Sequence, residues 1–312
     1  TISSIARDSL CDWEKGDVDN AISSLDQAYT YVLNMDDCDD PELMQQKEDM
    51  RYLISKRILE IYASRQAAVK GTSDAIPIVI NADVQRGSDL FTTGREQNFF
   101  RESYKRSGAY RAYIVEEFRK AGIPEELSWL PLIESGFKNQ ALSSARALGP
   151  WQFIPSTDYK FGLNRDDFVD ARMDPIKSTH AAIGYLKELH SMFGDWMTAL
   201  AAYNCGEGRV ARVIRTQNVN YLDNFWDLYS RLPNETARYV PRFLATLHVI
   251  NNAEKYGLDK VQLDAPWQYD TVTTNKQVSL QDLAKALNVS STELAELNPQ
   301  LRHQILPPTP FN

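Results

Sequence analysis

The sequence contains few cysteines and histidines, no long apolar run and no excess of basic residues. Three cysteines and four histidines are scattered among 312 residues, at spacings that match no metal-ligand pattern. No apolar run approaches the roughly 20 residues of a membrane-spanning helix. The formal net charge is −8, and no basic face stands out to offset phosphate charge. We therefore expect a globular protein that holds no metal or cofactor and does not bind nucleic acid.

The three cysteines leave one question open. Cys11 and Cys38 lie in segments that could be antiparallel neighbours, so in an oxidising compartment they either form a disulfide or remain two thiols. Cys205 is accompanied by no histidine or aspartate motif. We expect it to be a small buried residue and not a nucleophile.

Patterning divides the chain into three parts and predicts a mainly α fold. Residues 1–72 form an N-terminal helical region, with an apolar helical stripe that begins at Ala21. Residues 73–262 form a second helical domain, and we expect no substantial sheet before residue 265. Residues 263–312 form a small separate module.

Glycine, proline and aspartate mark the helix boundaries of the second domain. Gly122 ends one helix, and the next one leads toward residue 134. Asp174 and Pro175 begin another helix as N-cap and first helical residue, and Gly194 ends it. The last long helix of the domain is expected from about Glu235 to Tyr256.

A glutamate stands at the end of an apolar run. Glu134 closes "WLPLIE" and is followed by a Ser-Gly pair, which would leave its carboxylate at the mouth of a cleft. Burial against tryptophan and leucine is expected to raise its pKa, which suits a general acid. Ser143, nine residues later, is a candidate hydrogen-bond partner of this carboxyl group or of a substrate. Taken alone, Glu134 fits a simple helix-end residue equally well.

Two further stretches carry side chains that suit sugar binding. "ALGPWQFIPST" places Gly149, Trp151, Gln152 and Phe153 in and after a tight turn. Aromatic faces stack on pyranose rings, and amides bind hydroxyl and N-acetyl groups. Both aromatic residues also fit a plain core.

A helix-end motif, "AAYNCGEG", adds Tyr203 and Asn204. Tyr203 alone would more often be a core residue. Glu207 and Glu235 are interpreted as helix N-terminal carboxylates, which the helix dipole favours.

Taken together, four motifs resemble a known family. "LIESGF", "ALGPWQFIPST", "AAYNCGEGRV" and "ETARYVP" resemble, in this order and spacing, family 1 lytic transglycosylases of bacterial cell walls, of the membrane-bound lytic murein transglycosylase D type. The matching motifs run from about residue 93 to 257. The resemblance implies a goose-lysozyme-like helical catalytic domain with a glycan cleft.

The resemblance also assigns roles to residues. Glu134 falls on the catalytic acid/base of the family. Residues that fall on its substrate-binding motifs are Ser143, Gly149, Trp151, Gln152, Phe153, Tyr203, Asn204 and Tyr239. Pro150 departs from the motif, where a small or aliphatic residue is expected, and proline fixes φ and removes an N–H.

The C-terminal module resembles a LysM carbohydrate-binding module of βαα(β) form. "YDTVTT" is a β-like run, and two short helices follow, capped by Ser279 and by Ser290 or Ser291. The Gly-Asp turn expected after the first strand is absent, and no second strand is evident before Asn312. We therefore interpret the module as degenerate or truncated, which leaves its glycan affinity open.

A second catalytic carboxylate is hard to find in this sequence. Glycoside hydrolysis usually requires two, and the next acidic residue after Glu134 is Asp158, which nothing marks as catalytic. The resemblance implies cleavage between MurNAc and GlcNAc with formation of a 1,6-anhydroMurNAc end and Glu134 as single acid/base. A hydrolytic muramidase with water as nucleophile is the first alternative, and a non-catalytic glycan-binding scaffold is the second.

The resemblance also implies a cellular setting. Its substrate, the glycan strands of peptidoglycan, lies in the periplasm of Gram-negative bacteria. Family members are often anchored to the outer membrane, and an anchoring cysteine would lie before Thr1. The N-terminal helices suggest an additional protein partner.

Overall fold

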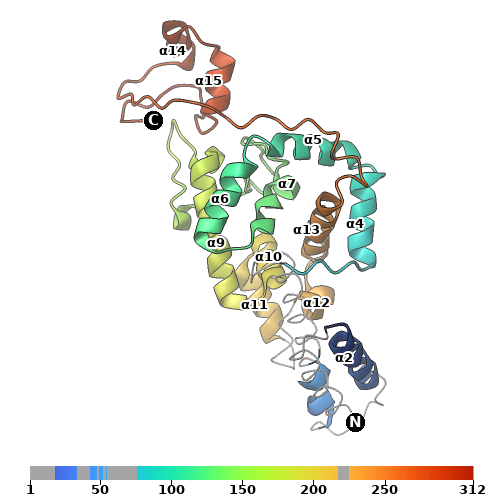
Figure 1. Cartoon of the computed structure of the whole chain (residues 1–312). Helices are drawn as coiled ribbons and strands as arrows, with labels where there is room; N and C mark the ends of the chain where they lie inside the picture. The colour runs from blue at the N-terminus through green and yellow to red at the C-terminus, as the bar shows by residue number, and fades with distance from the viewer. Residues whose placement is uncertain are drawn as a thin grey trace. The chain divides into compact units, whose positions relative to one another are not determined.

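The computed structural model describes residues 18–33, 43–47, 49–51, 54, 76–216 and 225–311 (Figure 1). These residues are mainly helical, as predicted, and among them β pairing is confined to isolated bridges. Cys11 and Cys38 lie outside the described residues. The chain divides into two compact units, residues 1–79 with 189–240 and residues 80–188 with 241–312, and each is described by itself. The domain boundaries at 72 and 262 stay predictions.

The first unit contains the predicted N-terminal helix. Helix α2 runs from Val18 to Leu33 and buries Leu25, Ala28 and Val32, which belong to the apolar stripe read from the sequence. Further helices of this unit include α10 (Trp196–Cys205), α11 (Glu207–Arg215), α12 (Phe225–Leu228) and η4 (Tyr229–Arg231). Glu207 lies in the first turn of α11, where the dipole favours a carboxylate.

The second unit contains the predicted active-site segment and the C-terminal module. Its helices are α4 (Ala82–Thr92), α5 (Gln97–Ser107), α6 (Arg111–Ala121), η1 (Glu125–Trp129), α7 (Leu130–Glu134), α8 (Pro155–Asp158), η2 (Tyr159–Phe161), η3 (Ala171–Met173), α14 (Leu280–Leu287) and α15 (Ser291–Leu297). Helices α9 (Pro175–Phe193) and α13 (Asn234–Asn251) each continue from one unit into the other along the chain.

The predicted helix boundaries are confirmed at three places. Gly122 caps α6 in the left-handed conformation, with φ 68°. Asp174 Oδ1 accepts hydrogen bonds from the backbone N–H groups of Ile176 and Lys177 at 2.9 and 3.0 Å, which makes it the N-cap of α9. Gly194, with φ 69°, follows the last residue of that helix.

The last long helix ends earlier than predicted. Helix α13 stops at Asn251, and the residues up to Gly257 form turns. Asn252 Nδ2 donates to the carbonyl oxygen of His248 at 2.8 Å, and Gly257 takes φ 68°. A side chain that binds a terminal carbonyl and a left-handed glycine are both typical of helix ends, and the apolar pattern used for the prediction does not report them.

The C-terminal module has its two predicted helices. Ser279 Oγ accepts from the N–H of Asp282 at 3.1 Å and caps α14, while Ser290 Oγ accepts from the N–H of Glu293 at 3.4 Å and caps α15. Of the two serines proposed for the second cap, Ser290 is therefore the one used. The two helices pack together at the red end of the chain in Figure 1.

The end of the chain returns to the segment before α14. Thr274 and Phe311 exchange two backbone hydrogen bonds of 2.9 Å, and the N–H of Leu306 donates to the carbonyl oxygen of Val278 at 2.8 Å. The segments at residues 274–279 and 305–311 therefore meet through isolated antiparallel bridges and do not form a regular strand pair. The returning segment occupies the place of the second strand that the sequence pattern did not show.

The module also contacts the loop at residues 165–170. The N–H of Asp170 donates to the carbonyl oxygen of Gln300 at 2.9 Å, and the N–H of Arg302 donates to that of Phe168 at 2.8 Å. Val169 forms a bridge with Leu301 and packs against the small core of the module, formed by Leu280, Leu301 and Leu306. The loop thus supplies part of the apolar core of the module.

Candidate active site

Glu134 is the last residue of α7. Leu130, Pro131 and Leu132 of this short helix are buried, and Glu134 itself is half-buried. The carbonyl oxygen of Pro131 accepts from the N–H groups of Ser135 and Phe137, both at 3.1 Å. The helix therefore closes directly behind the carboxylate, as the Ser-Gly pair predicted. The expected rise in the pKa of Glu134 stays a prediction.

The turn after Glu134 is fixed by α5. Gly136 and Phe137 both have left-handed φ angles, 62° and 59°. The carbonyl oxygen of Gly136 accepts from Arg106 Nε at 2.7 Å, and a Cβ at Gly136 would lie 2.5 Å from Ser103 Oγ. This position therefore needs glycine for both its conformation and its space.

Trp129, at the start of α7, is held between two side chains. Its ring stacks on that of Tyr104 with centroids 5.8 Å apart, and Arg111 Cζ lies 4.0 Å from the ring centroid. Burial lowers the pKa of the Arg111 guanidinium. A cation over an indole face is stabilised by the ring quadrupole. These contacts, which the sequence motifs did not indicate, hold the segment that presents Glu134.

Ser135 joins the end of α7 to the "GPWQ" turn. Its Oγ lies 2.9 Å from the carbonyl oxygen of Pro150 and 3.2 Å from that of Pro131, and the side chain is buried. Pro150, the residue that departs from the family motif, therefore contributes its carbonyl oxygen, which a proline retains.

The turn itself depends on Gly149 and Gln152. Gly149 has φ 88°, and a Cβ there would lie 1.9 Å from the carbonyl oxygen of Arg172. Gln152 has φ 53°, and its Nε2 donates to the carbonyl oxygens of Ala141 and Gly149 at 2.9 and 2.8 Å. The amide nitrogen of Gln152 thus holds the loop together.

Ser143 closes a smaller turn in the same loop. Its N–H donates to the carbonyl oxygen of Ala147 at 2.9 Å, and its Oγ accepts from the N–H of Ala147 at 3.0 Å. The side chain is half-buried. Its hydroxyl oxygen therefore has a structural role in shaping the loop.

The two aromatic residues of the motif have core surroundings. Trp151 is 1% exposed, donates from Nε1 to Thr179 Oγ1 at 3.1 Å and stacks on Phe118 with centroids 5.7 Å apart. Phe153 is 3% exposed and packs near Tyr185. In this conformation neither ring offers a face on which a sugar could stack, which favours the core interpretation left open above.

A buried ion cluster, formed by Arg172, Asp170 and Asp158, lies beneath the loop. Arg172 donates from Nη2 to Asp170 Oδ2 at 2.7 Å, and its Nε lies 3.2 Å from Asp158 Oδ2. Burial alone would raise the pKa of Asp170, but the hydrogen bonds and charge of Arg172 outweigh it and lower that pKa. Burial raises the pKa of Asp158, which Arg172 only partly offsets. No motif in the sequence marks this cluster; its one signal was the pair Asp170 and Arg172 within the short stretch "FVDARM".

The remaining predicted site residues lie in the first unit. Tyr203 and Asn204 are half-buried at the end of α10, and Asn204 Oδ1 accepts from Thr236 Oγ1 at 2.8 Å. Tyr239 is buried in α13. Burial raises the pKa of the neighbouring Cys205 thiol, which keeps it protonated and agrees with the expectation that it is not a nucleophile.

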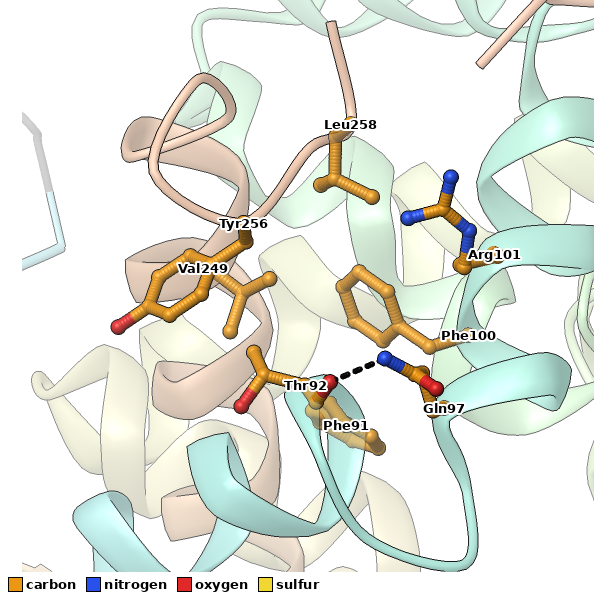
Figure 2. A pocket seen from close by; sticks show the side chains of 8 residues that line it. All are labelled: Phe91, Thr92, Gln97, Phe100, Arg101, Val249, Tyr256 and Leu258. Carbon is orange, nitrogen blue, oxygen red and sulfur yellow. Dashed lines mark hydrogen bonds between the residues drawn. The ribbon is translucent and has the colours of Figure 1, made fainter. Parts of the chain in front are cut away.

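Figure 2 shows a small hollow elsewhere in the second unit. It is lined by side chains of α4, α5, α13 and the turn segment that follows α13. Gln97 closes one side by donating to the carbonyl oxygen of Thr92. None of the predicted site residues lines it. Within the part of the chain that the structure describes, no group of histidine, cysteine and acidic residues could hold a metal ion. Among the helices that the structure describes, none combines the length and the hydropathy that a membrane-spanning segment requires.

Comparison with known proteins identifies two family domains. The transglycosylase SLT domain model matches residues 112–224, which include every predicted site residue except Tyr239. The LysM-like domain model of lytic transglycosylase MltD matches residues 268–311.

Relatives of known name agree with these matches. Membrane-bound lytic murein transglycosylase D of Escherichia coli (strain K12) is 35% identical over 206 residues, which is 65% of this chain and 45% of that protein. Membrane-bound lytic murein transglycosylase C of Histophilus somni (strain 2336) is 29% identical over 173 residues, 50% of this chain and 46% of that protein. The chain thus spans about half the length of the curated relatives that it matches.

A solved structure gives a weaker likeness. An inactive mutant of lytic transglycosylase Slt from Pseudomonas aeruginosa aligns with a TM-score of 0.40 and 18% identity, over 77% of this chain and 51% of that chain. Residues 112–224 of this chain are therefore similar to the transglycosylase SLT domain, and residues 268–311 are similar to the LysM-like domain of lytic transglycosylase MltD.

Proposed function

We propose that this protein is a peptidoglycan lytic transglycosylase that cleaves the MurNAc-β-1,4-GlcNAc bond and leaves a 1,6-anhydroMurNAc end. One observation carries the proposal. Within the stretch that matches the transglycosylase SLT domain, Glu134 ends a short helix of mostly buried residues, and Ser135 beside it is hydrogen-bonded to the "GPWQ" turn. The acid and the turn proposed to line the glycan site are thereby held together.

In the proposed mechanism, Glu134 acts twice. It first donates its proton to the glycosidic oxygen, so that the bond from MurNAc C1 to that oxygen breaks and GlcNAc leaves with a free hydroxyl group. The N-acetyl group stabilises the oxocarbenium-like intermediate. The Glu134 carboxylate then takes the proton of the MurNAc C6 hydroxyl, whose oxygen bonds to C1. No water molecule is consumed, and the acid is regenerated.

The state of Asp158 supports a single-carboxylate mechanism. Asp158 is the next acidic residue after Glu134 in the sequence, but its side chain is 9% exposed and ion-paired with Arg172. A base that activates water must reach the substrate and accept a proton. Asp158 is occupied in the ion cluster, so we assign it a structural role. No observation favours the hydrolytic alternative over the transglycosylase.

The proposed glycan contacts fall into two groups. In the second unit, the loop that we propose to contact the glycan is shaped by Ser143, Gly149 and Gln152. Its base is supported from the core by Trp151 and Phe153. In the first unit, the proposed contacts from the "AYN" motif and the late tyrosine are Tyr203, Asn204 and Tyr239. The match of the family model through residue 224 supports the first two of these.

We further propose the cellular setting that the relatives' names suggest. The substrate would be the glycan strands of peptidoglycan, in the periplasm of a Gram-negative bacterium. Association with the outer membrane through a segment outside this chain, and a protein partner for the N-terminal helices, belong to the same proposal. The relatives are named membrane-bound murein transglycosylases, which supports the envelope location.

The test compares muropeptides released from purified peptidoglycan by the wild type and by Glu134→Gln. The amide has nearly the same shape but cannot donate or accept the proton, so we expect release to fall by about a thousandfold or more. Glu116→Gln, an exposed change on α6 that removes an ion pair with Lys120, is the matched control and should keep full activity. Undiminished release by Glu134→Gln would refute the assignment of the acid.

A further inference from the structure

The guanidinium of Arg172 contacts both ends of the "GPWQ" loop. The Arg172 side chain is 4% exposed. Its Nη1 donates to the carbonyl oxygen of Arg146 at 3.2 Å and to that of Phe153 at 3.3 Å. The stretch between these two carbonyls contains Gly149, Trp151 and Gln152, which belong to the proposed glycan site. One side chain therefore binds the loop where it begins and where it ends.

The two carboxylates fix the orientation of this guanidinium. Asp170 accepts from Nε at 3.0 Å and from Nη2 at 2.7 Å, a bidentate arrangement that determines both position and plane. Asp158 adds a second negative charge 3.2 Å from Nε. The hydrogen bond to Asp170 raises the pKa of Arg172 further, so the group stays charged. With Nε and Nη2 bound by carboxylates, Nη1 points to the loop.

The backbone of Arg172 supports the same loop from below. A Cβ atom added to Gly149 would lie 1.9 Å from the carbonyl oxygen of Arg172, so the loop backbone packs directly against the backbone of residue 172. The ends of the loop are also paired with each other, since the N–H of Leu148 donates to the carbonyl oxygen of Phe153 at 3.0 Å. Side chain and backbone of Arg172 thus act on one segment.

We propose that Arg172 is a positioning residue of the active site, which holds the loop at residues 146–153 in its glycan-binding form. This inference rests on the proposed function for its kinetic consequence. It does not depend on that function for its structural consequence, the order of the loop. Arg172 acts through the loop and does not itself touch substrate, because its guanidinium is buried and each of its three nitrogens is hydrogen-bonded within the protein.

The kinetic consequence follows from the separation of loop and acid. Glu134 lies on α7, so loss of the Arg172 contacts leaves the acid on its helix and mainly weakens glycan binding. For Arg172→Met we expect KM to rise about tenfold while kcat falls much less, below the hundredfold that a misplaced reacting group can cost. Arg172→Lys keeps the charge and one contact to the loop, so it should recover part of the affinity.

Hydrogen exchange tests the inference without any activity. In Arg172→Met the amides of residues 141–153 should exchange at least about tenfold faster, with α5 and α6 unchanged. Arg172→Lys should give an intermediate rate and is the variant to measure if the methionine variant does not fold. Arg165→Met is the matched control: Arg165 is 53% exposed on the neighbouring loop and its Nε lies 3.7 Å from Asp170 Oδ2. It should change neither exchange nor KM.

The outcomes separate the two proposals. Unchanged exchange of residues 141–153 in folded Arg172→Lys and Arg172→Met would overturn the positioning role. Faster exchange over the whole unit, with KM unchanged, would also overturn it and leave Arg172 as a general stabilising residue. If the wild type released no muropeptides, the proposed function would fail, whereas selective loosening of the loop would still support the structural role of Arg172.

Discussion

Two glycines with positive φ angles differ in what surrounds them. At Gly149 a Cβ would lie 1.9 Å from the carbonyl oxygen of Arg172, whereas at Gly162, with φ 78°, nothing lies within 4 Å. An alanine at either position pays about 1 kcal/mol for the left-handed conformation. Only at Gly149 must the backbone of a buried segment also move. Comparing alanine substitutions at the two glycines therefore separates the cost of the left-handed conformation from the cost of the steric clash.

We predict that Gly149→Ala destabilises the protein by about 3 kcal/mol or more and abolishes muropeptide release, because the "GPWQ" turn cannot keep its geometry. Gly162→Ala should cost about 1 kcal/mol and retain activity. Denaturant unfolding and release assays of both variants measure the difference. Equal losses of stability in the two variants would show that the close approach at Gly149 is not a constraint.

The lowered pKa of Asp170 predicts how stability changes with acid. Asp170 is an acid whose folded pKa lies below its ordinary value of 3.8, so its stabilising contribution is complete above that value and is lost as the pH falls through the folded pKa. Asp170→Asn should lose about 3 kcal/mol near neutral pH, since one partner of a buried ion pair is removed.

This difference between wild type and Asp170→Asn should stay constant from about pH 7 to about pH 4 and shrink as the pH falls below 3.8, the ordinary pKa of aspartate, toward about 2. Unfolding free energies measured across this range provide the test. Asp167→Asn, an exposed change on the same loop, serves as the control and should follow the wild type. A difference that stayed constant to the lowest pH would contradict the ion-pair interpretation.

At the scale of elements, a hydrogen bond of Ser135 connects the end of α7 to the "GPWQ" turn. Ser135 Oγ lies 2.9 Å from the carbonyl oxygen of Pro150, fifteen residues along the chain. Ser135→Ala should cost about 1–2 kcal/mol and reduce activity more than stability, because it uncouples the acid from the turn. Ser107→Ala removes a buried hydroxyl that bonds within its own helix, to the carbonyl oxygen of Tyr104, and is the control.

Measurements of kcat/KM and of the free energy of unfolding for both serine variants test whether the Ser135 contact positions the site. We expect Ser135→Ala to lower kcat/KM by about tenfold and Ser107→Ala to leave it unchanged, although both lose one hydrogen bond. Equal effects on activity would mean that the Ser135 contact stabilises the fold without positioning the site.

The sequence predicted those elements that local chemistry determines. Gly122, Asp174 and Gly194 mark helix ends because a left-handed glycine or an N-cap acts within one turn. The helical fold class and the position of Glu134 at the end of an apolar helix followed from the same kind of signal.

The loop could not be predicted to the same degree. Its form depends on Arg172, which contacts carbonyls 26 and 19 residues away. No local pattern reports a contact of that range. For the same reason the sequence left open whether Trp151 stacks on sugar or lies in the core, and its partner Thr179 is 28 residues distant. Motif matching identifies such residues without showing which way they face.

At the scale of the molecule, the LysM-like module is held in its unit by packing and hydrogen bonds as well as by the covalent chain. Val169, from the loop at 165–170, packs against the core of the module and bridges Leu301. An aspartate at this position would bury a charge in a small apolar cluster. Val169→Asp should therefore detach the module while the helices of the SLT domain remain folded.

Limited proteolysis and hydrogen exchange measure this detachment. We expect faster cleavage within residues 259–273 and faster exchange of residues 298–306 in Val169→Asp. Val272→Asp, at a position that is 71% exposed, is the matched control and should behave like the wild type. Identical protection of residues 298–306 in both variants would show that the contact with Val169 does not hold the module.

In the mechanism that we propose, the sugar's own hydroxyl group, and not water, attacks the glycosidic carbon. Digestion of purified peptidoglycan in water labelled with heavy oxygen tests it most directly, by mass spectrometry of the released muropeptides. We expect products that are lighter than hydrolytic fragments by one water molecule, carry no label, and disappear with Glu134→Gln. Products with a labelled reducing end would contradict it and identify a hydrolase with a water-activating group still to be found.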